Sequence, residues 1–391
     1  MRNRNNATLR AWLIVGAAVW VCIGLDGATA SELGDALQAF DNRQYSQAHD
    51  LLRPLAQRGD GVAQLMLVGI YYAGWGVPPD YHLARDWKRQ SARDASEADA
   101  TPVVARWRRL AEAGDPLGQM MLGSAYNNGL GVDLDEAEAL RWIKRSAEQG
   151  NPRGEYALAM LYQAGEGTQP DMTMALEWYR RSAAQGDNWA EYNLGAAYQF
   201  GRGVKRSNAT AADWYRKAAE HGNPSAAYDL AWLLQTGSGI QRNEAEAARW
   251  YAAGAAGGDP LAMNNLALMY LKGQGGLPKD PARAYQLATL ACEKSHLVDD
   301  AGYQESLYAM KSKAARALGE PERRNALFEL GRRSRDGDGV PQDDVQAYRW
   351  MHKSLETEDD PEAIRVRTTV LEEMAKRMHP DAIERAKDPF L

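Results

Sequence analysis

Cysteine is nearly absent from this chain, which has 391 residues and only Cys22 and Cys292. Cys22 falls within an N-terminal segment that, as argued below, we expect to be removed. A single remaining cysteine excludes an intramolecular disulfide in the mature chain, so core packing alone would have to stabilise it. We therefore expect Cys292 to be a small buried apolar side chain.

The sequence also lacks the residue patterns of an enzyme or a metal site. Its six histidines form neither H-x3-H nor H-E-x2-H, and no G-x-S-x-G is present. Carboxylates are abundant, but no pair of them stands out. No basic tract accompanies the formal charge of −6, so nucleic acid is not an expected partner. We expect no catalytic residue, no metal ligands and no cofactor.

The first thirty residues have the features of an export signal. Arg2, Arg4 and Arg10 are followed by an uncharged, mostly apolar segment over residues 11–25, and then by Ala28-Thr29-Ala30. Fifteen residues span only about 22 Å as a helix, which is short of a bilayer core. We predict a signal peptide over residues 1–30, cleavage near Ala30, and a periplasmic or secreted mature chain. The alternative is an uncleaved anchor, which would be the chain's only attachment to a membrane.

Phenylalanine is scarce, with 4 residues, whereas tryptophan (12), tyrosine (18) and glycine (36) are plentiful. Many of these residues recur every 36 positions. One tryptophan column, one tyrosine column (with Leu234 in place of one tyrosine) and two glycine columns keep this interval: Trp142, Trp178, Trp214 and Trp250; Tyr126, Tyr162, Tyr198 and Tyr270; Gly129, Gly165, Gly201, Gly237 and Gly273; Gly131, Gly167, Gly203, Gly239 and Gly275. Such a period predicts a stack of repeated units, with the aromatic columns packed between them.

Each repeat has the start and stop signals of two helices. An Asp or Asn followed by proline predicts the start of the first helix, as at Asp115-Pro116 and Asn151-Pro152. The G-x-G pattern predicts its end. Asp135, Asp171, Ser207 and Asn243, again 36 residues apart, predict the start of the second helix. Each unit is therefore expected to be an antiparallel helix pair.

The combined pattern resembles the Sel1-like repeat, a relative of the tetratricopeptide repeat, and residues 122–132 (LGSAYNNGLGV) match it closely. Imperfect copies extend the resemblance over about residues 60–356. It implies an exported bacterial protein with an all-α fold, a right-handed α-solenoid of antiparallel helix pairs. We expect an N-terminal helix pair at 31–59, the solenoid at 60–356, and C-terminal capping helices at 357–391.

The period breaks twice. Tyr71 and Tyr126 are 55 residues apart, and Tyr270 and Ser334, which takes the tyrosine position, are 64 apart. These breaks predict insertions near residues 92–104 and 297–320. We expect an extended second helix and a loop in the first, and an extra helix around residues 304–318 in the second.

The first helices carry a stripe of variable residues on which we expect a partner to bind. The resemblance implies that first helices line the concave side of the superhelix. We call this set the concave stripe: Leu117, Met121, Ser124, Asn128, Arg153, Ala157, Met160, Ala164, Trp189, Asn193, Ala196, Phe200, Ser225, Asp229, Trp232, Thr236, Leu261, Asn265, Leu268 and Lys272. From it we predict eight partner-binding residues: Met121, Arg153, Trp189, Asn193, Phe200, Asp229, Trp232 and Asn265. The alternative is that these side chains pack against a neighbouring helix.

The resemblance implies a non-catalytic scaffold. Proteins with Sel1-like repeats commonly act as adaptors in envelope assembly, exopolysaccharide systems, signalling or host contact. We expect an exported monomer that binds a protein or peptide partner. The alternative is a β-lactam-binding or β-lactam-hydrolysing enzyme, as in cysteine-rich relatives. Those carry paired cysteines in each repeat, and this chain does not.

Overall fold

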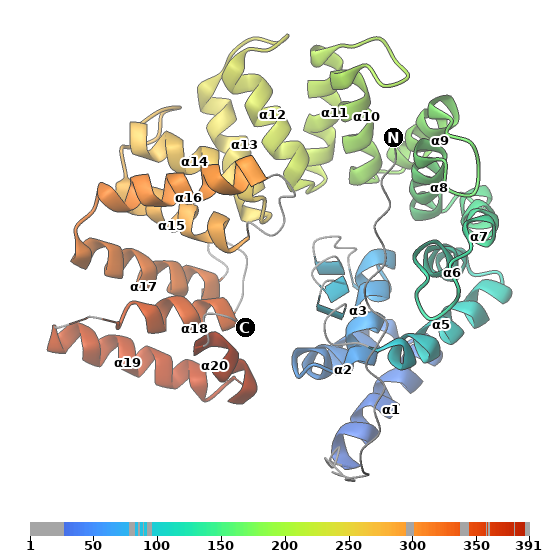
Figure 1. Cartoon of the computed structure of the whole chain (residues 1–391), viewed down its shortest axis with the longest axis horizontal. Helices are drawn as coiled ribbons and strands as arrows, with labels where there is room; N and C mark the ends of the chain where they lie inside the picture. The colour runs from blue at the N-terminus through green and yellow to red at the C-terminus, as the bar shows by residue number, and fades with distance from the viewer. Residues whose placement is uncertain are drawn as a thin grey trace, which may run out of the picture.

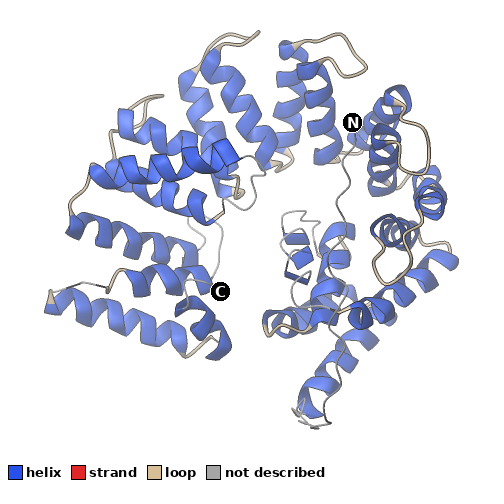
Figure 2. Ribbon diagram, viewed as in Figure 1, coloured by secondary structure: helices blue, strands red, loops and turns tan. Residues whose placement is uncertain are grey.

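The computed structural model describes residues 27–77, 83–84, 87–88, 90–91, 96–294, 301–336, 344–356, 358, 360–378 and 380–387. Nearly all of the predicted signal peptide lies outside these residues. The G-x-G of the last imperfect repeat, Gly337 and Gly339, also lies outside them. Within them all regular structure is helical (Figure 2). No described helix is long and apolar enough to cross a membrane.

The helices form a single curved series (Figure 1). The N-terminal pair is α1 (Gly27–Asp41) and α2 (Tyr45–Gln57). The first helices of the repeats are α3 (Gly61–Ala73), α6 (Pro116–Asn128), α8 (Pro152–Ala164), α10 (Asn188–Phe200), α12 (Pro224–Thr236), α14 (Pro260–Lys272) and α17 (Glu320–Asp336). The second helices are α7 (Glu136–Glu148), α9 (Met172–Ala184), α11 (Asn208–Glu220), α13 (Glu244–Ala256), α15 (Pro281–Glu293) and α18 (Asp344–Lys353). The chain ends in α19 (Pro361–Ala375) and α20 (Pro380–Lys387).

Both ends of each first helix follow from local chemistry. The Asp115 carboxylate accepts a hydrogen bond from the Gly118 amide at 2.7 Å and caps the first turn of α6. At the other end Gly129 has φ +63° and Gly131 has φ +60°, values that disfavour any residue with a side chain. A Cβ at Gly131 would also lie 2.9 Å from the Ala100 carbonyl carbon. These residues therefore specify the hairpin.

The most buried aromatic column is a tyrosine column on the second helices. Tyr179, Tyr215 and Tyr251 are fully buried. Each hydroxyl donates a hydrogen bond to a glutamine Oε1 of its own repeat: Gln163 at 3.1 Å, Gln199 at 2.5 Å and Gln235 at 2.9 Å. These bonds satisfy the one polar atom of a large buried ring, so each tyrosine ties its second helix to its first.

The tryptophan column, which lies one residue before these tyrosines in the sequence, is less buried than predicted. Trp142 and Trp178 are 8% exposed and belong to the core, whereas Trp214 and Trp250 are half-buried. The Arg181 guanidinium lies 4.4 Å from the centre of the Trp178 ring. A cation over the outer ring face is favourable where one side of the indole meets solvent.

Each break in the period contains an additional helix. The first contains α5 (Glu97–Glu112), which packs on α3 and α6. Ser96 and Asp99 form a reciprocal capping box, so α5 begins as a separate helix at Glu97. The prediction that the second helix of the preceding repeat extends through this insertion is therefore wrong. The second contains α16 (Ala301–Arg316), close to the predicted helix, which packs on α14 and α15.

First helices of several neighbouring repeats pack on one another. Among neighbouring repeats, α3 packs on α6, α6 on α8 and α12 on α14. In Figure 1, α6 lies inside α7, and the two ends of the series lie on the same side of the molecule. The concave stripe is carried by the first helices, of which α6 lies on the inside of the curve (Figure 1).

Cys292 is buried, as predicted, and burial raises the pKa of its thiol.

Candidate functional site

Exposed apolar side chains gather on the concave stripe. In residues 116–294, which the structure describes without a gap, the exposed large apolar residues are Leu134, Met160, Phe200 and Trp232. Three of these four belong to the stripe, on α8, α10 and α12. Phe200 is 60% exposed, Met160 46% and Trp232 38%. Two of them are predicted binding residues, and Met160 is a stripe residue that was not singled out.

Trp189 differs from the other two predicted aromatic anchors. It is half-buried, and its ring meets Tyr192 edge-on at 6.0 Å between centroids. The Asn193 amide donates to the Trp189 carbonyl at 2.9 Å within the same helix. Trp189 therefore has a packing role in addition to any contact with a partner.

Arg153 connects two repeats across the stripe. Its guanidinium donates to the Asp187 carboxylate at 2.6 Å, and the Asp187 side chain is almost fully buried. Asp187 also caps α10 by accepting from the amides of Trp189 and Ala190 at 3.0 Å. Burial raises the pKa of Asp187, whereas Arg153 and these amides lower it. The ion pair thus fixes the start of α10 against α8.

A second set of links runs between consecutive first helices. The Tyr156 hydroxyl of α8 is hydrogen-bonded to the Asn193 side chain of α10. One repeat further on, the Tyr192 hydroxyl donates to the Asp229 carboxylate of α12. Both pairs are 37 residues apart in the sequence. Asn193 and Asp229 therefore link consecutive first helices.

Asp229 is the one acidic residue of the stripe, and its pKa is raised. Burial, and next the nearby Asp259 carboxylate, raise its pKa from 3.8 to about 7, whereas the bond from Tyr192 lowers it. Asp259 caps α14 through the Ala262 amide at 2.8 Å. An acid in this state exchanges a proton with solvent near neutral pH.

The two remaining predicted residues lie at opposite ends of the stripe. Asn265 is half-buried on α14. Met121 is only 3% exposed and packs in the N-terminal core, because α3 and Trp107 of α5 cover this side of α6. The structure thus places Met121 in the wall of a cavity rather than on an open surface.

The tyrosines at 156, 192 and 228 are site residues that the sequence analysis missed. They recur every 36 residues, directly before three stripe residues, and this interval was a signal that could have revealed them. Burial raises the pKa of all three hydroxyls. They provide neutral hydrogen-bonding groups on the first helices α8, α10 and α12.

The chemistry of this surface is that of binding. Among the described residues no group of three or more His, Cys, Asp or Glu side chains could hold a metal ion. The stripe offers aromatic faces, amides and an adjustable carboxyl group, which suit recognition of another surface.

Comparison with known proteins agrees with the architecture. The Sel1 repeat model matches residues 62–96, 116–151, 152–187, 190–223, 224–259, 260–296 and 324–356. It leaves out α5 and α16. A search of curated proteins found no match.

Similar solved structures come from several bacteria. A Sel1 repeat protein from Oxalobacter formigenes is 29% identical, with 66% of this chain and 96% of that chain covered and a TM-score of 0.44. A protective antigen of uropathogenic Escherichia coli is 24% identical, with 87% and 92% covered and a TM-score of 0.32. An immunity protein from Pseudomonas aeruginosa is 20% identical, with 58% and 77% covered and a TM-score of 0.29. Proteins built from Sel1 repeats are generally scaffolds for protein–protein interaction. On the seven matched repeats, this chain belongs to the Sel1 repeat family.

Proposed function

We propose that this chain is an exported, non-catalytic scaffold that binds a protein or peptide partner on the middle of the concave stripe. The observation that carries the proposal is the gathering of exposed Met160, Phe200 and Trp232 on three successive first helices. Aromatic residues and methionine are enriched in interface cores, and a few of them supply most of the binding energy.

The polar links beneath these side chains favour binding without rearrangement. Arg153 and Asp187 join α8 to α10, and Tyr192 and Asp229 join α10 to α12. A surface held in place by such links loses less conformational entropy on binding. The partner would then contact a preformed inner surface rather than order it.

The two additional helices direct the partner to the central repeats. Residues of α3 and α5 cover Met121 at the N-terminal end of the stripe. At the other end α16 packs on α14, and its Tyr303 is close enough to Tyr228 to raise the pKa of that hydroxyl. Along the series, α8, α10 and α12 lie between these two helices.

Export is the second part of the proposal and is supported by the signal-like residues 1–30. We place the mature scaffold in the periplasm or outside the cell as a monomer. Its role would be in envelope assembly, an exopolysaccharide system or signalling control.

Site-directed photo-crosslinking in the native cell envelope tests the proposal. A photoreactive benzoylphenylalanine replaces Trp232 on the stripe, and in a matched control it replaces Asp213, which is exposed on the second helix α11. We expect discrete adducts from position 232 that are absent from position 213. Adding Phe200→Ala to the position-232 variant should reduce their yield.

Equal labelling from both positions, or no adduct from either, would contradict a partner on the stripe. Retention of the unprocessed chain in the cytoplasm, detected by fractionation and mass spectrometry, would contradict the export part.

A further inference from the structure

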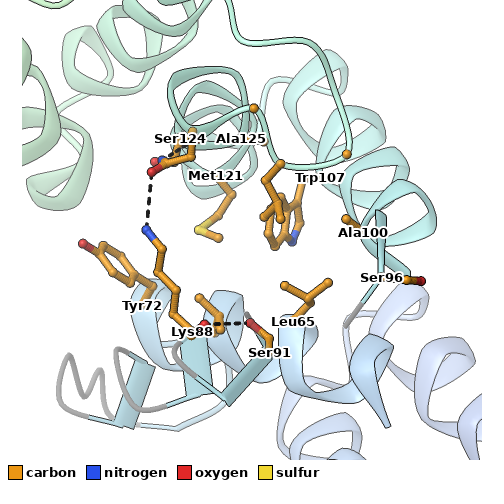
Figure 3. A pocket seen from close by; sticks show the side chains of 15 residues that line it. Leu65, Tyr72, Lys88, Ser91, Ser96, Ala100, Trp107, Met121, Ser124 and Ala125 are labelled. Atoms are coloured by element: carbon orange, nitrogen blue, oxygen red, sulfur yellow. Dashed lines mark hydrogen bonds between the residues drawn. The ribbon is translucent and has the colours of Figure 1, made fainter. Parts of the chain in front are cut away.

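A cavity of about 570 Å³ lies where the first break interrupts the repeat (Figure 3). Its walls come from α3, residues 88 and 91, α5, and α6 with its following turn. Volumes of about 300–1,000 Å³ are typical of sites for small molecules. The cavity is distinct from the exposed apolar residues of the central repeats, which lie on α8, α10 and α12.

The interior of this cavity is largely apolar. Leu65 and Val68 of α3, Trp107 of α5, and Met121 and Ala125 of α6 form much of the lining. Trp107 and Met121 are almost completely buried. An apolar group that entered the cavity would leave water for a wall of matching chemistry.

The serine hydroxyls of the lining are already engaged within the protein. Ser91 donates to the Lys88 carbonyl at 3.0 Å, and Ser96 donates to the Asp99 carboxylate at 2.8 Å. Ser124 contacts the Met120 sulfur at 3.7 Å. These hydroxyls therefore do not need a hydrogen-bonding group on a ligand.

Among the described residues that line the cavity, Lys88 is the one that carries a charge. Its ammonium group donates only to a neutral amide oxygen, that of Asn128, at 3.4 Å. The ion pairs found among the described residues do not include Lys88. Figure 3 shows this side chain reaching across the cavity toward α6, at the opposite side from Trp107.

The cavity thus combines an apolar interior with one cation that has no acidic partner in the described part of the chain. A ligand that matches both features has an apolar chain and a negatively charged end. The indole N–H of Trp107 also finds no acceptor among the described residues.

We propose that this cavity binds a medium-chain carboxylate, a fatty acid with its carboxylate at Lys88 and its alkyl chain between α3 and α6. The same chemistry is available from free fatty acids and from anionic single-chain lipids. The site goes beyond the partner-binding surface and does not depend on it.

Calorimetric titration of the purified mature chain tests the proposal, with octanoate, decanoate and dodecanoate as probes below their micelle concentrations. Each added CH2 should tighten binding about fourfold until the cavity is filled. Decanol, which has the same chain without the charge, should bind more weakly than decanoate. Lysophosphatidylglycerol with a decanoyl chain distinguishes a lipid source from the free acid.

Two variants separate the charge from the space. Lys88→Met keeps most of the side-chain length and should weaken decanoate binding about twofold to fivefold while leaving decanol unchanged. Ser124→Phe, at a half-buried position of α6, should fill the cavity and remove binding of both probes. Lys144→Met on α7 is the matched control, and circular dichroism verifies that each variant is folded.

Three results would overturn the proposal: no saturable binding of any probe, equal affinity for decanol and decanoate, or decanoate binding that Ser124→Phe leaves intact. The crosslinking from position 232 is independent of the cavity. Its persistence alongside a negative titration would reject the carboxylate site and leave the proposed scaffold function standing.

Discussion

Replacing Asp229 by asparagine should stabilise the protein at neutral pH and remove part of its pH dependence. Burial and the neighbouring Asp259 carboxylate raise the Asp229 pKa from 3.8 to about 7. The equivalent positions in the adjacent repeats are already asparagine, Asn193 and Asn265. The Asn193 amide is hydrogen-bonded to Tyr156, and an amide oxygen at position 229 could accept from the Tyr192 hydroxyl as the Asp229 carboxylate does, so an amide fits this place.

The sign follows from proton linkage. Because the folded-state pKa of Asp229 is raised, its stabilising contribution is complete below about pH 4. It is lost as the pH rises to about 7 and stays lost above that value. A shift of this size corresponds to about 4 kcal/mol at most, and since the residue is only half-buried we expect about 2–4 kcal/mol.

Urea unfolding followed by circular dichroism from pH 4 to 8 measures the effect. The difference in unfolding free energy between Asp229→Asn and the parent should be near zero at pH 4 and should favour the variant at pH 8. Asp213→Asn, an exposed change on α11, should show no such trend. Parallel pH curves for the parent and Asp229→Asn, or a variant that is less stable at pH 8, would refute the reasoning.

The remaining predictions concern packing and processing. Trp178→Ala should lower the unfolding free energy by about 3–5 kcal/mol in urea melts, whereas Trp232→Ala, at an exposed site, should change it by less than about 0.5 kcal/mol while weakening partner crosslinking. Equal stability losses would place Trp232 in the core. Gly195→Ala should cost about 1–3 kcal/mol, because the new Cβ would lie 2.6 Å from the Tyr215 ring; an unchanged melting temperature would show that the ring can move away. Mass spectrometry of the exported chain should find an N-terminus directly after Ala30, and a full-length exported chain would indicate an anchor instead.

The regular repeats could be predicted from the sequence because their signals are local. An N-cap residue, a proline and a left-handed glycine act within one turn of chain, and the structure starts α6 at Pro116 and ends it before Gly129 as they indicate. The repeat interval then extends this inference along the chain. Cys292 was predictable for the same reason, since it lies on the apolar face of α15.

The breaks were harder to predict because their structure depends on contacts between distant segments. Ser96 and Asp99 do carry a capping-box signal, but the period offered no slot for a further helix there. Met121 has the sequence position of an exposed stripe residue, and only the packing of α3 and α5 on α6 buries it. Trp250 shows the opposite case. It takes a position that the repeat predicts to be in the core, but its side chain is only half-buried.

The spacing of the inner polar links has a consequence for how this chain can change length. Tyr156 pairs with Asn193, and Tyr192 pairs with Asp229, each across 37 residues. Excision of residues 188–223 would bring Tyr156 to the same separation from Asp229 and would recreate a tyrosine–aspartate pair that the protein already uses. Duplication of that segment would likewise supply each donor with an acceptor. Such a chain can gain or lose whole units in evolution without orphaning a buried polar group, so the reach of the scaffold can vary while its inner surface stays intact.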